Sequence, residues 1–385
     1  MNSSDAKFAR QTSDDNGDTL STLHDSILSH ILSFLPTKLA ASTSILSTRW
    51  KHIIFSVPRL DLDDSFLLNN PQKEDVEDDE GEEAQPQSQP PQNFIEFVNR
   101  ILLSRWARDS FPVYELRLRC RHMPRNVLLK SWISASLSPN IRHLDVCIEK
   151  QKDHTIGGVL PSELFSCKAL EVLKFRGRVV LKIPKLASLP KLKVLRLELL
   201  ILIGDSTTWK FSEKFPMLDD LKLDSISLRN FSGLDISLPL LRELELGLFD
   251  LGRSLPEFRN LTYEEIMASH DYEWQLLPDL LQRAPNLEML VCDLEKCKRT
   301  SRGLEYPEET ETLSLAQHLR EVKISHFVGL EFEFKLVRYI LKHGKVLENI
   351  TIRASEDDYS SSIWKKLFKL SACFQNCVVD FKFEE

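Results

Sequence analysis

The apolar residues of this 385-residue chain recur, from Val113 onward, in a six-residue motif with the pattern apolar-x-x-apolar-x-apolar. The motif begins at nine positions: Val113, Ile141, Leu170, Leu192, Leu218, Leu241, Leu287, Leu319 and Leu347. Successive starts lie 22 to 32 residues apart, except for one gap of 46 residues after Leu241. Because side chains of a strand alternate between its two faces, each motif predicts a short strand with one buried face.

The spacing of the motifs indicates that these strands stack side by side. A period of about 20 to 29 residues is typical of leucine-rich repeats, whose units bury their apolar faces only against their neighbours. Each buried Leu or Ile contributes roughly 1.5–3 kcal/mol, so nine stacked units make a stable scaffold. The pattern predicts an α/β solenoid of irregular leucine-rich repeats. The 46-residue gap holds "TYEEIMASHDYEWQLLPDLLQRAPN", which fits either a longer helical insertion or one degenerate repeat.

The outward-pointing residues in and just after these motifs are mostly basic in the early repeats. The basic positions are Arg117, Arg119, Lys174, Arg176, Arg196 and Lys222, and the acidic positions among them are Asp145, Glu198, Asp224 and Glu245. We expect the basic stripe to bind the substrate, through an acidic protein segment or a polyanionic small molecule. The alternative is a solvated strand face with local ion pairs, which are common and weak.

The stretch from Leu23 to Trp50 has a helical apolar pattern. Six apolar residues form a wide stripe on a first helix: Leu23, Ile27, Leu28, Ile31, Leu32 and Leu35. Pro36 ends this helix, while Thr37 and Ser47 can cap a second and a third helix. Three short helices in about 45 residues cannot bury so many large apolar groups among themselves. Either a partner protein or the chain's own repeats must cover the remainder.

The net charge of -7 lies in one segment. Residues 71–92, "PQKEDVEDDEGEEAQPQSQPPQ", hold eight acidic residues and one lysine, so the rest of the chain sums to zero. This balance does not support a basic nucleic-acid-binding domain. Residues 1–18 and 71–92 predict a disordered tail and a disordered linker, although the linker could also be an acidic docking tract. A helix starting at Asn93, with Glu96 as its capping-box partner, is expected to begin the second domain.

Candidate chemistry is sparse along the chain. There is no nucleophile elbow, P-loop or dinucleotide-binding glycine pattern, so we predict no catalytic residues and no cofactor. The seven cysteines are scattered without zinc-ligand spacing and predict reduced thiols in an intracellular protein, nuclear or cytoplasmic, with no metal site. No apolar run of 18 residues occurs, so no membrane partner is expected.

Residues 19–64 resemble the F-box of the plant F-box/leucine-rich-repeat family. The matching phrases are "DSILSHILSFLPTK", "TSILSTRWKH" and "VPRLDLDD". Residues 318–352, "HLREVKISHFVGLEFEFKLVRYILKHGKVLENITI", and the closing "FQNCVVDFKF" resemble the FBD module that ends many members of that family. The resemblance implies a three-helix F-box at 19–64, a leucine-rich-repeat solenoid at 93–312 and an FBD module at 313–385 that continues the solenoid.

The resemblance also implies a function. In that family the F-box binds a Skp-type adaptor of a cullin-RING ubiquitin ligase, and the solenoid holds a substrate protein, here unknown. The adaptor-facing residues would be Leu23, Ile27, Leu28, Ile31, Leu35, Pro36, Ala40, Leu46 and Trp50. Two positions depart from the family pattern, His24 in place of Pro and Ile54 in place of Trp. These departures leave open an alternative, a non-ligase scaffold or decoy that binds proteins without recruiting the ubiquitin machinery.

Overall fold

The computed structural model describes residues 22–67, 90–106, 113–150, 157–247, 257–268, 271–295, 297, 317–354, 361–371 and 377–383. The predicted disordered tail, 1–18, lies outside these residues, as does the predicted linker except for its last three positions. No helix in the described ranges is both long enough and apolar enough to cross a membrane.

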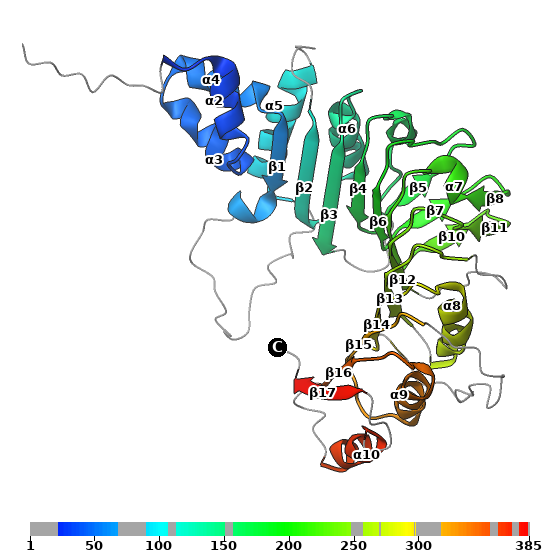
Figure 1. The fold of residues 1–385 in the computed structure, drawn as a ribbon. Helices are drawn as coiled ribbons and strands as arrows, with labels where there is room; N and C mark the ends of the chain where they lie inside the picture. The colour runs from blue at the N-terminus through cyan, green and yellow to red at the C-terminus, as the bar shows by residue number, and fades with distance from the viewer. Residues whose placement is uncertain are drawn as a thin grey trace, which may run out of the picture.

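Twelve parallel strands form one curved sheet that runs along the whole described chain (Figure 1). Nine of them start two residues after the nine motif positions: β2 (Glu115–His122), β3 (His143–Lys150), β4 (Val172–Arg176), β6 (Val194–Glu198), β9 (Asp220–Asp224), β12 (Glu243–Gly247), β14 (Met289–Asp293), β15 (Glu321–Ser325) and β16 (Asn349–Ala354). The prediction of an α/β chain with one strand per motif is confirmed. The first apolar residue of each motif precedes the strand, and the other two point into the core.

The 46-residue gap holds a degenerate repeat. Strand β13 (Tyr263–Met267) pairs in parallel with β12 on one side and β14 on the other, and η5 (Asp271–Leu276) and α8 (Leu277–Arg283) follow it. The spacing Leu261, Glu264, Ile266 is that of the motif, with a glutamate in the second apolar position. This glutamate is why the apolar pattern alone does not reveal the repeat.

The sheet begins inside the segment that resembles an F-box. Strand β1 (Arg59–Asp63) pairs with β2, placing Leu60 beside Leu116 and Leu62 beside Leu118 in the buried layer. The acidic segment is therefore an insertion between two elements that already belong to one sheet. Across that insertion, Asp64 accepts a hydrogen bond from the backbone N–H of Arg121 at 2.9 Å. Apolar residues of the N-terminal helices and of the repeats belong to one hydrophobic core.

The N-terminal helices are α2 (Asp25–Leu32), α3 (Thr37–Ser42) and α4 (Thr48–Ile53), joined by η1 (Thr43–Ile45) and followed by η2 (Ile54–Ser56) and η3 (Asp64–Leu67). Ser47 caps α4 as predicted, accepting from the N–H of Trp50 at 3.4 Å. The predicted cap at Thr37 is wrong, because Thr37 is the first helical residue and Pro36 holds the cap position. The hydroxyl of Thr37 instead accepts a hydrogen bond from the backbone N–H of Asp61 on strand β1.

Helix α5 (Gln92–Trp106) begins one residue before the predicted start. Glu96 accepts a hydrogen bond from the side chain of Gln92 at 3.0 Å, so the expected capping box at Asn93 does not form. Asn93 instead accepts from the N–H of Phe94 at 2.9 Å.

The remaining described helices lie on the outer side of the curved sheet (Figure 1). They are α6 (Asn126–Ser136), η4 (Ser162–Ser166), α7 (Phe211–Lys214), α9 (Glu331–His343) and α10 (Ser361–Ser371). Two small sheets accompany them: β10 (Ser227–Arg229), β7 (Ile201–Ile203) and β5 (Val180–Lys182), and β11 (Gly233–Asp235) with β8 (Thr208–Lys210). Strand β17 (Val378–Phe383) closes the large sheet. Among the described residues, the helices therefore lie on the side of the sheet opposite to its inner face.

The turn before α9 is organised around one buried glutamate. A single carboxylate oxygen of Glu333 accepts the backbone N–H groups of Val328 at 3.1 Å, Gly329 at 2.6 Å and Leu330 at 2.9 Å. Gly329 has a φ of 87°, a left-handed conformation that favours glycine. This contact fixes how the helix of the C-terminal module leaves β15.

Candidate functional surfaces

The N-terminal helices expose an unusual density of large apolar side chains. The described residues include seventeen exposed large hydrophobic side chains, and seven of them fall within residues 27–46: Ile27, Ile31, Phe34, Leu35, Leu39, Ile45 and Leu46. Ile45 is 87% exposed and Leu46 is 68% exposed. Single exposed apolar residues are ordinary, whereas a concentration of this kind marks an interaction site.

The structure divides the predicted adaptor-facing residues into three groups. Ile27, Ile31, Leu35 and Leu46 are exposed, and Leu23, Pro36 and Trp50 are half-buried. Leu28 and Ala40 are fully buried in the core of the chain, so they support the surface and offer no contact area themselves. The helical stripe identified apolar positions but could not show which of them the chain itself covers.

Three exposed residues were missed by the sequence reasoning. They are Phe34, Leu39 and Ile45, and none of them belongs to the predicted helical stripe or to the predicted adaptor-facing set. The sequence contained a signal for Phe34 and Leu39. Each is a large apolar residue that fits no buried stripe, so burial within the chain does not explain it.

Polar contacts hold α2 against the later helices. The guanidinium of Arg49 pairs with Asp25 at 2.6 Å and also donates to the carbonyl of Leu23. The hydroxyl of Ser29 donates to the carbonyl of Ser56 at 2.9 Å. These contacts hold α2, which carries the exposed Ile27 and Ile31, against α4 and η2.

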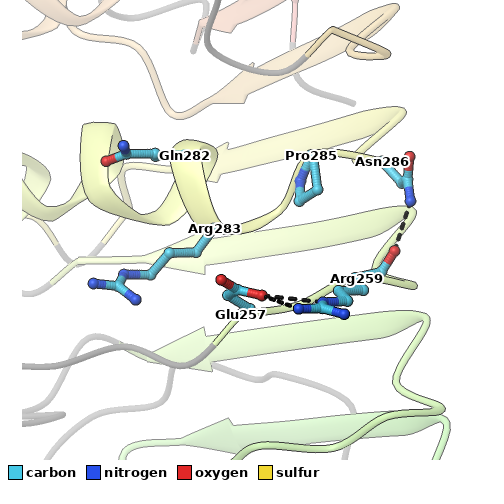
Figure 2. A pocket seen from close by; sticks show the side chains of 6 residues that line it. All are labelled: Glu257, Arg259, Gln282, Arg283, Pro285 and Asn286. Carbon is cyan, nitrogen blue, oxygen red and sulfur yellow. Dashed lines mark hydrogen bonds and ion pairs between the residues drawn. The ribbon is translucent and has the colours of Figure 1, made fainter. Parts of the chain in front are cut away.

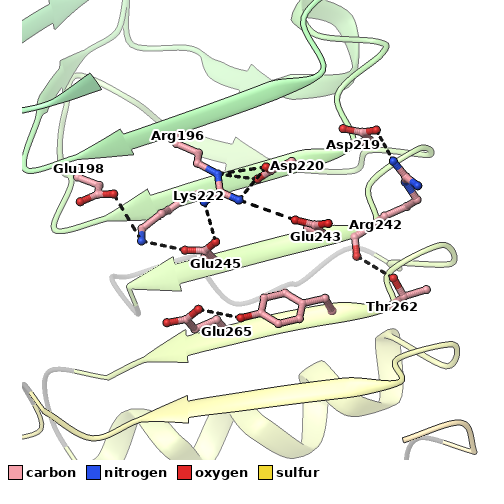
Figure 3. A network of polar contacts seen from close by, with 11 residues as sticks. Arg196, Glu198, Asp219, Asp220, Lys222, Arg242, Glu243, Glu245, Thr262 and Glu265 are labelled. Carbon is pink, nitrogen blue, oxygen red and sulfur yellow. Dashed lines mark hydrogen bonds and ion pairs between the residues drawn. The ribbon is translucent and has the colours of Figure 1, made fainter. Parts of the chain in front are cut away.

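The inner face of the sheet carries a network of ion pairs across β6, β9 and β12 (Figure 3). Arg196 pairs with Asp220 at 2.8 Å and with Glu245 at 3.4 Å. Lys222 pairs with Glu245 at 2.8 Å and with Glu198 at 3.4 Å. Glu245 thus joins both basic side chains, and it is 8% exposed.

The network decides the protonation of its members. Burial alone would lower the pKa of Arg196, but the hydrogen bond and charge of Asp220 outweigh it and raise that pKa. The pKa of Lys222 is raised in the same way, because Glu245 outweighs burial. Burial first, then the hydrogen bond it donates to Glu265 at 2.9 Å, raises the pKa of the Tyr263 hydroxyl. Arg196 and Lys222 therefore both remain protonated, and each has carboxylate partners on the sheet.

The predicted basic stripe is thus not uniform. Arg196 and Lys222 are surrounded by carboxylates, which is the local ion pairing given as the alternative. Arg117, which is half-buried, lies 3.8 Å from Asp145, and Arg176, which is exposed, lies 3.6 Å from Glu198. Arg119 and Lys174 form no ion pair with any other residue in the described ranges.

Comparison with known proteins places the two ends of the chain in named families. Residues 20–62 match the F-box domain and residues 313–352 match the FBD domain. The chain is 24% identical over 449 aligned residues to the F-box/FBD/LRR-repeat protein At1g51370 of Arabidopsis thaliana, covering 94% of this chain and 95% of that protein. The chain belongs to the plant F-box/FBD/leucine-rich-repeat family.

Other Arabidopsis thaliana members of the family match parts of the chain. The F-box/LRR-repeat protein At4g14103 is 34% identical over 230 residues, 59% of this chain and 55% of that protein. The putative F-box protein At3g58820 is 26% identical over 383 residues, 89% of this chain and 88% of that protein. The match thus spans about half the length of the first relative. F-box proteins generally act as substrate adaptors of SCF ubiquitin ligases, and F-box/LRR proteins are typically their non-catalytic subunits.

The two departures from the family pattern have different structural settings. His24 holds the N-cap position of α2, where its Nδ1 accepts from the N–H of Ser26 at 3.3 Å. Its φ of -65° is one that proline also adopts. Ile54 is 4% exposed and packs into the F-box interior, so it alters core packing and not the exposed surface.

Two of the hollows on the described repeats are lined by charged side chains. The larger, of about 520 Å³, lies by the loops before β13 and β14 and is lined by Glu257, Arg259, Gln282, Arg283, Pro285 and Asn286 (Figure 2). Arg259 pairs with Glu257 at 2.8 Å, and Asn286 donates to the carbonyl of Arg259 at 2.6 Å. The smaller, of about 310 Å³, lies between β8, α7 and the turn before β8. Five of the six residues that line the larger hollow have polar or charged side chains, and two of the charged ones pair with each other.

One cluster carries metal-ligand side chains. Ligand atoms of Asp293, Glu295 and His326 all lie within 4.8 Å of one another. Asp293 Oδ1 lies 2.9 Å from His326 Nδ1 and also accepts from the N–H of Glu295 at 2.9 Å. These hydrogen bonds account for the arrangement, and the cluster is not assigned to a metal.

Proposed function

We propose that this chain is the substrate-recognition subunit of an SCF-type cullin-RING ubiquitin ligase. Its F-box would bind a Skp-family adaptor and through it a cullin, and its repeats, stacked as a leucine-rich-repeat solenoid, would hold a target protein. The observation that carries the proposal is the apolar surface of the F-box, where seven large side chains are exposed within residues 27–46. Such a surface needs a partner, and the F-box family supplies the partner's class.

The proposed adaptor contacts are the exposed members of the predicted set together with the three that the structure adds. They are Ile27, Ile31, Phe34, Leu35, Leu39, Ile45 and Leu46, with Leu23, Pro36 and Trp50 at the margin. Covering a fully exposed Leu or Ile contributes roughly 1.5–3 kcal/mol, so two or three central residues suffice to dominate the affinity.

The chain would act without catalytic residues of its own. Tied to the ligase at one end and to a target at the other, it raises the effective concentration of the target beside the charged conjugating enzyme. The continuous packing between the F-box helices and the repeats supports this role. F-box helices contact the first strand of the sheet whose inner face would hold the target, and both share one core. Arg117, Arg119, Lys174 and Arg176 remain proposed substrate contacts on that face.

Co-purification with a recombinant Skp-family adaptor tests the proposal. An Ile45→Asp, Leu46→Asp variant should lose capture by at least about tenfold while its melting temperature stays unchanged, because both side chains are exposed. Leu186→Asp is the matched control, since Leu186 is exposed on the repeats, away from the F-box. Failure of the intact chain to capture the adaptor would overturn the proposal.

A non-ligase scaffold or decoy is the second candidate, and the residue at position 24 favours it. The family pattern has proline there, and the backbone of His24 already has a φ that proline adopts. If only the His24→Pro variant captures the adaptor, the natural chain has lost ligase assembly. Ile54→Trp should not be combined with His24→Pro in this test, because Ile54 is buried and the larger ring would overpack the F-box.

A further inference from the structure

The inner face of the sheet carries opposite charge at two places. On β6, β9, β12 and β13, six carboxylates face two basic side chains, an excess of four negative charges; the carboxylates are Glu198, Asp220, Asp224, Glu243, Glu245 and Glu265. We call these four strands the acidic end. On β2, β3 and β4, five basic side chains face three carboxylates, Glu115, Asp145 and Glu149; the basic ones are Arg117, Arg119, Arg121, Lys174 and Arg176. We call these three strands the basic end.

The pairing pattern leaves charge available at both ends. Arg119 and Lys174 form no ion pair within the described ranges. At the acidic end, Arg196 and Lys222 each contact more than one carboxylate, and Glu243 is half exposed and 3.8 Å from Arg196. The edge strand β1 adds Arg59, Asp61 and Asp63 to the same face, which lowers the excess of positive charge at this end to one, against an excess of four negative charges at the acidic end. The face is therefore polarised along the sheet.

The register fixes the distance between the two ends. Lys174, Arg196, Lys222, Glu245 and Glu265 occupy one row, each beside the next on neighbouring strands. Parallel strands lie about 4.8 Å apart, so Lys174 and Glu265 are separated by four steps, or about 19 Å. An extended peptide covers that distance in about six residues.

We propose that this face binds an extended segment of a partner protein that carries an acidic block and, about six residues away, a basic block. The acidic block would lie over Arg119 and Lys174, and the basic block over Glu243 and Glu265. Charge complementarity is the argument, because a segment of one sign would be repelled at one end of the face. The inference rests on the proposed function, since the segment would belong to the target of the ligase.

Three labelled peptides of equal length test the inference on the full chain by fluorescence anisotropy. The block peptide has about four glutamates, about six glycine or serine residues and about four lysines. The alternating peptide has the same composition with its charges interspersed, and the acid-only peptide has serine in place of lysine. At about 20 mM salt the block peptide should bind at least about tenfold more tightly than either of the others, and about 0.5 M salt should abolish the difference.

Charge-neutral variants locate the site. The pair Arg119→Gln, Lys174→Gln and the pair Glu243→Gln, Glu265→Gln should each weaken binding of the block peptide by about three- to tenfold. The matched control is Glu257→Gln with Arg259→Gln, an exposed ion pair in a loop, which should leave binding unchanged. Equal binding of all three peptides, no effect of either inner-face pair, or no binding at low salt would overturn the inference.

Adaptor capture by the same protein preparations separates this inference from the proposed function. Absent or unselective peptide binding with normal adaptor capture overturns the polarised site alone. Selective peptide binding without adaptor capture overturns the ligase role and leaves the polarised site standing.

Discussion

The side-chain hydroxyl of Thr37 accepts a hydrogen bond from the backbone N–H of Asp61 at 2.7 Å. Thr37 begins helix α3 of the F-box, and Asp61 is the middle residue of the first strand of the repeat sheet. An unpaired sheet edge exposes N–H groups that favour association with other chains. The F-box here caps part of that edge, which places its apolar surface at a fixed position relative to the repeats.

Replacing Thr37 should therefore weaken the junction. Thr37 is 2% exposed, and Thr37→Val keeps its shape but leaves the Asp61 N–H without this partner. We expect a loss of about 1–3 kcal/mol in the free energy of unfolding, measured by urea denaturation. Thr37→Ser keeps the hydroxyl and should recover most of the loss. Equal stability of the Val variant and the natural chain would show that the bond does not support the junction.

A buried carboxyl group should limit the stability of the degenerate repeat. Glu264 is fully buried between Leu244 and Leu290, and neither of its carboxylate oxygens has a hydrogen-bond partner among the residues that the structure describes. Burial raises the pKa of Glu264 well above its usual range. Glu264→Leu restores the apolar motif and should stabilise the protein at pH 8 by about 1–4 kcal/mol. A less stable Leu variant at pH 8 would contradict this.

The same carboxyl group predicts a pH dependence. Because the pKa of Glu264 is raised on folding, the folded state holds a proton that the unfolded state releases. This contribution to stability is fully present below about pH 4.5, the usual pKa, and is lost as the pH rises toward the folded value. The advantage of the Leu variant should therefore grow from pH 5 to pH 8. A constant advantage across that range would assign the effect to packing alone.

The repeat strands could be predicted from sequence because their signal is periodic. Nine motifs gave nine strands, whereas β13 was ambiguous because Glu264 interrupts the apolar pattern. The candidate surfaces were harder to predict. A helical stripe does not reveal that Leu28 turns inward while Ile27 remains exposed. The carboxylates that surround Arg196 could have been found, since Asp220 and Glu243 occupy the third position of their motifs.

The turn before α9 should depend on the carboxylate of Glu333. Its three backbone hydrogen bonds are at most 3.1 Å long, and the side chain is 2% exposed. Glu333→Ala leaves the backbone N–H groups of the exposed Val328 and the half-buried Gly329 and Leu330 without this acceptor and should cost about 2–4 kcal/mol, measured by urea denaturation. Glu331→Ala, two residues earlier and exposed, is the matched control and should change stability by less than about 0.5 kcal/mol. Comparable losses in both variants would point to the favourable acidic charge in the first turn of the helix and not to the hydrogen bonds of the turn.

In the inner-face network, the contribution of a carboxylate to the free energy of unfolding should depend on how deeply the carboxylate is buried and not on the number of ion pairs that the network contains. Glu245 is 8% exposed and contacts both Lys222 at 2.8 Å and Arg196 at 3.4 Å, whereas Glu243 is half exposed and 3.8 Å from Arg196. Glu245→Gln removes the charge shared by two partly buried cations, and we expect it to cost about 1–3 kcal/mol. Glu243→Gln should cost less than about 0.5 kcal/mol, because exposed pairs are screened by solvent. Urea denaturation of the two variants at low and high salt checks both values. If the two substitutions cost the same, the network is a set of independent surface pairs, and Arg196 and Lys222 would then be as available to a partner as Arg119.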